Sequence, residues 1–373
     1  MHEFSRVRMI LRERIGPSGP APGAVLRVRF NEEVVFHEAY GYRQILPQEL
    51  PTTEETLFDL ASLTKSVGTS LAVMQLWSQK KIDLDARIGL YHHDIEGTGK
   101  EWITIRHLLS HTSGLPAWRP YFREVATDAR PVSPLEMYRR ILGEPVEAPL
   151  GTKEIYSDLG FMLLGWILEC LTGEPLDRLF SRLIFSPLGL SQTGFRRISC
   201  QGTPEGIESK DHSAVASTEW CPWRGRMLTG EVHDENCYAM GMVAGHAGLF
   251  STAEELDRIV FEVMKGYQGV SRVFGKEGVR TFLNRQEVAT QGSWALGWDT
   301  PSPQDSSSGI YFSKNSFGHN GFTGTSIWMD VDRGVSVILL TNRVHPRRER
   351  QGIKQLRQDI HNAVMISVGL AQD

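Results

Sequence analysis

The sequence is poor in cysteine, in long apolar runs and in excess charge of either sign, and each shortage excludes a class of protein. Four cysteines are spread over 373 residues, with no C-x-x-C pair among Cys170, Cys200, Cys221 and Cys237. Four cysteines in a chain of this length do not make a disulfide framework. We therefore expect reduced thiols and a cytoplasmic location.

Apolar residues never run for the roughly 18 positions that a membrane-spanning helix needs. The first residues, MHEFSRVRMILRERIGPSGPAPG, are interrupted by Arg6, Arg8, Arg12 and Glu13, which is not the pattern of a secretory signal. They predict a short amphipathic helix followed by a Pro/Gly linker. The net charge is −4 and the pI is about 6.3, so we expect neither a basic surface nor a nucleic-acid partner.

Hydrophobic periodicity predicts strands towards both ends of the chain and helices between them. A β-hairpin is expected at 24–42, and further strands at 293–299, 316–324, 325–331 and 334–342. Helices are expected from Ser62 to before 82, and at 104–111, 134–143, 159–173, 252–266 and 353–370. Residues 196–236, which include Trp220 and Trp223, are polar and predicted as loops.

This order of elements predicts an α+β fold. One antiparallel sheet, assembled from both ends of the chain and flanked by helices, would carry an inserted, mostly helical subdomain. We place the sheet subdomain at 1–60 and 245–373 and the helical subdomain at 61–244. The active site is expected in the cleft between them.

Two S-x-x-K patterns offer a nucleophile beside an amine, Ser62–Lys65 and Ser78–Lys81. The second lies at the end of its helix, where a lysine suits the helix dipole and solvent. Ser62 lies in the first helical turn, where unpaired backbone N–H groups favour an alkoxide. Lys65 is one turn further on, so its amine can reach the Ser62 hydroxyl, and a dry pocket would lower its pKa. Ser62 as a simple helix cap is the alternative.

Two further segments carry polar groups at positions suited to acid/base work. Tyr156, in EIYSDLG, precedes a buried helix and could pass a proton to a leaving group, or serve only in packing. Asp158 is expected to cap that helix. In SFGHNGFTGTS, glycines leave the backbone open to a substrate, and His319 lies at the edge of that opening.

Together, Ser62-Leu-Thr-Lys65, Tyr156-Ser-Asp158 and His319-Asn-Gly321 resemble the three motifs of the serine β-lactamase and penicillin-binding protein superfamily. The likeness is to its class C-like branch, which includes esterases, D-amino-acid peptidases and low-molecular-weight penicillin-binding proteins. The segments TIRHLLSHTSGLP, AGHAGLFSTAEEL and ILLTNRVHP agree with this branch. The resemblance covers roughly residues 22–346.

The resemblance implies a serine hydrolase that works without a cofactor on a small ester, amide or peptide. Ser62 would be acylated, Lys65 would accept its proton, and Tyr156 would serve the leaving group. The oxyanion would lie between the backbone N–H groups of Ser62 and Phe322, next to Gly321.

Two departures from the family pattern bear on the substrate. Asp158 stands where many relatives have asparagine, and a carboxylate cannot donate a hydrogen bond as an amide does. His319 replaces a lysine, so any anchoring of a substrate carboxylate by it would weaken as the pH rises. These departures favour an esterase or D-amino-acid peptidase. A penicillin-binding protein or weak β-lactamase with slow deacylation, and a non-catalytic ligand-sensing module, are the alternatives.

The remaining histidines carry weaker signals. His107 and His111 have the spacing of a zinc pair, but Leu108 stands where the H-E-x-x-H motif has glutamate, so no metal site is expected. Two positions are open for His246, in the lining of the cleft or in a simple turn. Trp220 and Trp223 are compatible with a wall of the cleft or with burial between sheet and helices.

Overall fold

The strands from the two ends of the chain form one antiparallel sheet, as predicted. The computed structural model describes residues 3–126, 130–198, 204–206, 214–286 and 292–372. The strand order in the sheet is β10-β11-β12-β1-β2-β3. The strands are β1 (Gly23–Phe30), β2 (Glu33–Gln44), β3 (Leu50–Pro51), β10 (Ser316–Asn320), β11 (Ser326–Asp330) and β12 (Val335–Thr341).

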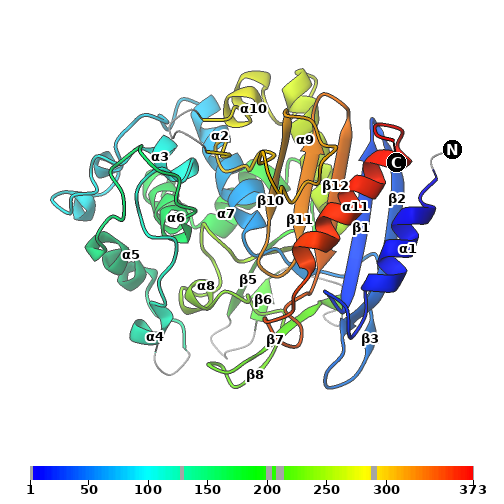
Figure 1. The fold of residues 1–373 in the computed structure, drawn as a ribbon. Helices are drawn as coiled ribbons and strands as arrows, with labels where there is room; N and C mark the ends of the chain where they lie inside the picture. Colours follow the sequence, from blue (N-terminus) through cyan, green and yellow to red (C-terminus); the bar gives the residue numbers. More distant parts are fainter. Residues whose placement is uncertain (1–2, 127–129, 199–203, 207–213, 287–291, 373) are drawn as a thin grey trace.

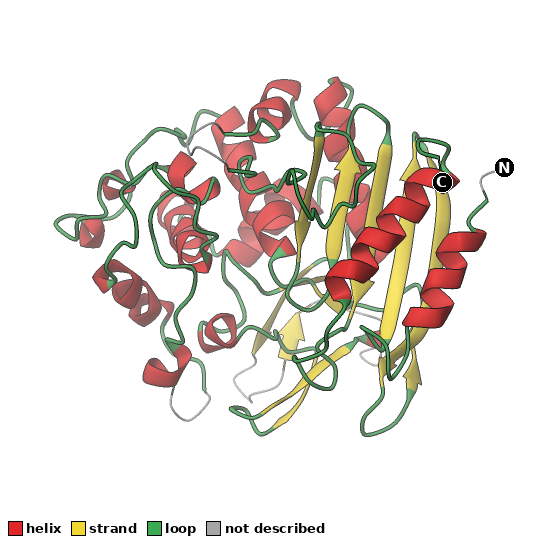
Figure 2. Cartoon of the chain, in the orientation of Figure 1, coloured by secondary structure: helices red, strands yellow, loops and turns green. Residues whose placement is uncertain are grey.

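Helices cover both faces of this sheet (Figures 1 and 2). The terminal helices α1 (Ser5–Arg14) and α11 (Ile353–Ser367) pack on one face, and α9 (Ala253–Gln268) packs on the other against β1 and β12. Every residue of β12 is buried, which explains its mainly apolar sequence. α10 (Lys276–Phe282) packs beside α9.

The chain between the two sets of sheet strands is mostly helical, and it lies to the left of the sheet in Figure 1. It contains η1 (Lys65–Ser70, a π-helix), α2 (Leu71–Ser78), the 3₁₀ turns η2 (Ile88–Leu90) and η3 (His93–Ile95), α3 (Ile105–Leu109), α4 (Phe122–Val125), α5 (Pro134–Gly143), α6 (Asp158–Thr172), α7 (Leu176–Phe180), η4 (Ser181–Phe185, a π-helix) and α8 (Glu235–Ala239). The predicted helices are therefore present. The predicted subdomain boundaries stay a prediction.

Short strands join the helical part to the sheet. β4 (Phe58–Asp59), β9 (Leu249–Ser251), β5 (Gly194–Ile198) and β6 (Pro204–Gly206) form a second sheet in the order β4-β9-β5-β6. β7 (Ser217–Cys221) and β8 (Arg226–Thr229) form a separate hairpin. Because β4 ends just before Ser62, this second sheet fixes where the candidate nucleophile lies.

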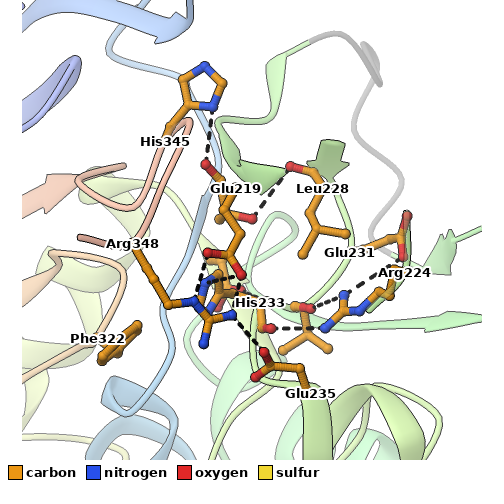
Figure 3. Close-up of polar contacts among 12 residues, drawn as sticks. Glu219, Arg224, Leu228, Glu231, His233, Glu235, Phe322, His345 and Arg348 are labelled. Carbon is orange, nitrogen blue, oxygen red and sulfur yellow. Dashed lines mark hydrogen bonds and ion pairs between the residues drawn. The ribbon is translucent and has the colours of Figure 1, made fainter. Parts of the chain in front are cut away.

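Two predictions of local structure were wrong. Residues 196–236, predicted as loops, contain the end of β5 and all of β6, β7 and β8. Buried polar residues there find partners in distant segments; Arg348, for example, pairs with Glu219 of β7 (Figure 3). Residues 293–299, predicted as a strand, form isolated bridges in place of a strand, one between Trp294 and Asp299 and one between Asp299 and Gly318 of β10. The chain turns back there at Gly297, whose φ of +79° suits glycine.

Three of the four cysteines lie in the described residues, and Cys200 lies outside them. Cys170, Cys221 and Cys237 are unpaired, in agreement with the expected thiols. Cys170 is exposed, because it lies in the last turn of α6 where the helix leaves the core. Among the described residues, no single helix is long and apolar enough to cross a membrane, although α6 and the segment Leu176–Phe185, bent by 81°, satisfy the length and composition criteria as a pair.

Candidate active site

Ser62 lies in a turn whose geometry is held by a buried carboxylate. The side chain of Asp59, the last residue of β4, accepts the N–H of Ala61 at 2.8 Å and that of His233 at 2.6 Å. Ala61 has a φ of +47°, a conformation that costs a non-glycine residue of order 1 kcal/mol and that persists only where the surroundings impose it. The turn therefore presents Ser62 in a defined orientation.

Lys65 is fully buried beneath Ser62, and its ammonium group makes three contacts. It donates to the Ser62 hydroxyl at 2.9 Å and to the His246 carbonyl at 3.0 Å, and it pairs with Asp158 at 2.6 Å. Lys65 begins the π-helix η1, in which wider turns replace the regular α-helical ones. The predicted contact between Ser62 and Lys65 is present.

The electrostatics of Lys65 differ from the prediction. Burial lowers the pKa of its amine, as expected, but the Asp158 carboxylate and the Tyr156 hydroxyl outweigh burial and raise the pKa above its ordinary value. Lys65 is therefore an ammonium in the resting protein. The expectation of a lowered pKa was wrong, because Asp158 was expected to cap α6. Ser157 caps it instead, accepting the Gly160 N–H at 3.1 Å, which leaves the Asp158 carboxylate free to reach Lys65.

Tyr156 completes the polar group around Ser62. Its hydroxyl lies close enough to the side chains of Ser62 and Lys65 for both to influence its pKa, and the Lys65 Nζ lies 5.0 Å from the centre of its ring. Burial of the hydroxyl raises the Tyr156 pKa, although the Lys65 charge opposes that shift. The ring packs against His111 and Trp294, at centroid distances of 4.6 and 5.4 Å. The three predicted catalytic side chains thus meet at one place.

The third motif lies across the pocket, on β10 and the turn after it. His319 is buried, and burial together with the Lys65 charge lowers its pKa to about 3, so its imidazole is neutral at physiological pH. It therefore carries no charge at neutral pH with which to anchor a substrate carboxylate. Any loss of such anchoring with rising pH would occur well below neutral pH. Gly321 is required, because a Cβ there would lie 2.1 Å from the Thr325 hydroxyl. Within the described part of the chain, neither the Ser62 nor the Phe322 amide donates a hydrogen bond.

These groups line one pocket of about 590 Å³, a volume typical of small-molecule sites. Of the predicted site residues, all but Lys65 line it: Ser62, Tyr156, Asp158, His319, Gly321 and Phe322. Lys65 lies just beneath the surface of the pocket and reaches it through Ser62.

Sequence reasoning missed several residues of this pocket. Asp234 accepts from the His246 ring at 3.0 Å, and Arg343 and Arg357 also line the pocket. The sequence carried no signal for them, because a carboxylate in a loop and arginines near the end of a chain are usually surface groups.

The remaining candidates have other roles. His246 lines the pocket, as one of its two interpretations had it. His111 accepts the Ser157 N–H at 3.0 Å, whereas His107 hydrogen-bonds with Thr104 at the start of α3, so the two rings serve different contacts. Trp220 and Trp223 line a neighbouring cavity, and Trp223 also packs against the main hydrophobic core.

Replacing Asp158 with asparagine should move the acid limb of the kcat/KM–pH profile to lower pH. Without the carboxylate, burial becomes the dominant influence on Lys65 and lowers its pKa, so the free amine is present at lower pH. We expect a displacement of roughly one pH unit or more, since one unit corresponds to about 1.4 kcal/mol. The measurement is kcat/KM for p-nitrophenyl acetate across the acidic to alkaline range. An acid limb at the same pH as in the wild-type protein, or a variant inactive at every pH, would contradict the proposed effect of Asp158 on the Lys65 pKa.

The fold around this site is shared with solved hydrolases. The structure matches EstCE1, a hydrolase with promiscuous acyltransferase activity, with a TM-score of 0.73, 22% identity, and coverage of 96% of this chain and 97% of that one. It also matches an octameric penicillin-binding protein homologue from Pyrococcus abyssi, with a TM-score of 0.69, 21% identity, and coverage of 94% of this chain and 74% of that one. The fold is therefore the β-lactamase-like fold of these structures.

Sequence comparison gives the family. The family model named Beta-lactamase matches residues 11–362. A protein of Escherichia coli (strain K12), named as a D-alanyl-D-alanine carboxypeptidase, is 32% identical over 348 residues, covering 87% of this chain and 79% of its own. An N-acetylmuramyl-L-alanine amidase of Bacillus subtilis (strain 168) is 34% identical over 346 residues, covering 87% and 78%. The chain belongs to the β-lactamase family, and the predicted resemblance is confirmed.

Proposed function

We propose that this hydrolase cleaves an ester or amide through an acyl-enzyme on Ser62. The observation that carries the proposal is the contact of Ser62 with both Lys65 and Tyr156 in one pocket. The Ser62 oxygen attacks the substrate carbonyl, and its proton passes to Lys65 once that amine is neutral. Tyr156 delivers a proton to the departing alcohol or amine, and water then releases the acid and restores Ser62.

The oxyanion formed in each step needs donors on the opposite side of the carbonyl. The backbone N–H groups of Ser62 and Phe322 can donate to the oxyanion, since both residues border the pocket and neither amide donates to another group among the described residues. Removing one such donor in serine hydrolases costs about 10²–10³ in rate, so their placement matters as much as the nucleophile.

The charge of the pocket supports a substrate that bears a carboxylate. Arg357 is 7% exposed, and among the described residues it donates only to the carbonyls of Gly321 and Thr325, while its Nε has no partner there. Burial and the neighbouring Arg343 lower the Arg357 pKa to about 9, which leaves it charged at neutral pH. Neither arginine pairs with a carboxylate among the described residues. A buried cation without a counter-ion is costly, and a substrate carboxylate would offset that cost.

Replacing Arg357 with methionine should therefore penalise anionic substrates selectively. A lost hydrogen bond between charged groups is worth about 1.5–3 kcal/mol, so kcat/KM should fall about 10- to 100-fold for a D-alanyl-D-alanine peptide with a free carboxylate. Arg357 also supports the Gly321 carbonyl, and the same peptide with a C-terminal carboxamide controls for that loss. Equal losses on the two peptides would mean that Arg357 acts only through the backbone.

The proposal is tested with a panel of p-nitrophenyl esters, D-alanyl peptides and a chromogenic cephalosporin, assayed with the wild-type protein. The names of the relatives direct the panel towards amides of amino acids, and on that ground we favour a peptidase or amidase over a β-lactamase. Labelling by penicillin without turnover would favour a penicillin-binding protein with slow deacylation. Ligand-induced stabilisation without turnover of any substrate would favour a sensing module and contradict the proposal.

A further inference from the structure

The segment 111–117 (HTSGLPA) comes after α3 and lies beside the chain that carries Tyr156. Backbone N–H groups of that chain donate to carbonyls of the segment: Glu147 to Gly114 at 2.7 Å, Ile155 to His111 at 2.8 Å, and Gly151 to Thr112 and Asp158 to Ala117, both at 2.9 Å. These bonds satisfy and restrict the backbone on both sides of Tyr156. Segment 111–117 is therefore a template for the chain that presents the phenol.

His111 holds the residues immediately before and after Tyr156. Its carbonyl accepts the Ile155 N–H at 2.8 Å, and Nδ1 of its ring accepts the Ser157 N–H at 3.0 Å. Its ring also packs on the Tyr156 ring, with 4.6 Å between the centroids. One residue thus fixes the backbone at both neighbours of Tyr156 and contacts the phenol itself.

Two features make His111 unfavourable for the stability of the fold. Its φ is +58°, in the left-handed region that residues other than glycine seldom adopt. Burial, together with the Lys65 charge, lowers the pKa of the imidazole well below its ordinary value, so the ring is neutral. A neutral ring that accepts through Nδ1 carries its proton on Nε2, and among the described residues this buried Nε2–H has no partner. Strained and unsatisfied groups of this kind cluster at functional sites, where the surroundings maintain them.

The position of the Tyr156 hydroxyl decides whether it can protonate a leaving group. In the proposed acylation Ser62 gives its proton to the Lys65 amine, Tyr156 protonates the departing oxygen, and Lys65 then returns a proton to Tyr156. Each transfer needs hydrogen-bond reach, and a misplacement of about 1 Å can cost about 10²-fold in rate. Ring contacts limit such movement, since the Trp294 centroid lies 4.6 Å from that of His111 and 5.4 Å from that of Tyr156.

We propose that His111 is a positioning residue, which aims the Tyr156 hydroxyl at the leaving group through the Ser157 N–H that its Nδ1 accepts. His111 is buried and is not among the residues that line the pocket, so it acts through Tyr156 and not on the substrate. A role in packing would require only the shape of the ring, whereas positioning requires the acceptor at Nδ1. The proposal rests on the proposed function, because it takes Tyr156 as the proton donor.

The test compares two esters that share an acetyl group. p-Nitrophenolate is a weak base and leaves p-nitrophenyl acetate without a proton, whereas the alkoxide of benzyl acetate is strongly basic and needs one. His111→Leu keeps an apolar side chain and removes the acceptor. It should lower kcat/KM for benzyl acetate by roughly 10²-fold, and for p-nitrophenyl acetate by roughly tenfold less than that. Deacylation is common to both esters and does not enter kcat/KM.

The conservative variant His111→Asn should restore turnover of benzyl acetate. Asparagine Oδ1 lies as many bonds from Cα as histidine Nδ1, and asparagine tolerates a φ of +58°. His111→Gln places the same amide one carbon further out, so it should not restore turnover. His107→Leu is the matched control, because it removes another histidine of this region and its bond to Thr104. It should lower the melting temperature without changing the ratio of the two kcat/KM values.

Tyr156→Phe should discriminate between the two esters as His111→Leu does, and combining the two changes should add little further loss. Equal losses on the two esters in a folded His111→Leu variant would overturn the positioning role. Failure of His111→Asn to recover benzyl acetate at a wild-type melting temperature would do the same. If the leucine variant does not fold, asparagine against glutamine decides the question. Failure of the proposed function appears separately, as hydrolysis that survives Ser62→Ala or as equal effects of Tyr156→Phe on the two esters.

Discussion

Replacing Ser62 with alanine should lower hydrolysis of p-nitrophenyl acetate by roughly 10⁴-fold or more and abolish covalent labelling by a fluorophosphonate. Among the described residues, Ser62 carries the one hydroxyl that lies against both Lys65 and Tyr156. Alanine removes that oxygen and leaves the turn intact, since the Asp59 contact with the Ala61 N–H does not involve the Ser62 side chain. The measurements are kcat/KM and the intact mass after labelling.

The chain supplies a matched control for this substitution. Ser78 is the serine of the second S-x-x-K pattern, and it lies exposed at the end of α2. Ser78→Ala should retain wild-type labelling and turnover. Labelling that persists in Ser62→Ala, or that disappears in Ser78→Ala, would show that the acylated residue has been misassigned.

Replacing Lys65 with methionine should lower kcat/KM for the same ester by roughly 10³-fold or more and also destabilise the protein. Methionine has a similar length but no proton to exchange, so Ser62 loses its acceptor. The raised pKa of Lys65 means that its pairing with Asp158 stabilises the fold fully below the unfolded pKa, and that this stability is lost as the pH rises through the folded pKa. At neutral pH the pairing contributes in full, and breaking a buried pair costs up to about 3–5 kcal/mol.

The catalytic and structural losses can be separated with a double variant. Lys65→Met combined with Asp158→Asn removes both charges, so it should recover much of the melting temperature without recovering activity. Lys81→Met, in the exposed S-x-x-K pattern, should change neither property. If the double variant regained activity together with stability, Lys65 would be a structural residue and not the proton acceptor.

Regular local patterns in the sequence predicted most of the architecture. The alternation at 24–42 and the apolar run at 334–342 correspond to β1, β2 and β12, and the 3.6-residue period of 252–266 corresponds to α9. These elements bury a face whose periodicity follows from backbone geometry alone, so it can be read without knowing the partner. The three motifs likewise identified Ser62, Lys65 and Tyr156, which the structure brings together, with Lys65 beneath the pocket that Ser62 and Tyr156 line.

The failure to predict strands in residues 196–236 has a physical cause. The β7–β8 hairpin looks like a loop because its buried polar residues are compensated by side chains such as Arg348, more than a hundred residues further along the chain.

The sequence by itself determined that this chain builds a sheet from its two ends and carries a serine and a lysine one helical turn apart, since both are properties of local spacing. Only the tertiary structure decided that Lys65 is an ammonium, because its protonation depends on whether Asp158 or Ser157 caps α6. It also decided that a cavity lined by Trp220 opens beside the site. Charge states and cavities arise from groups that are distant in sequence and are brought together by folding, and no local pattern records them.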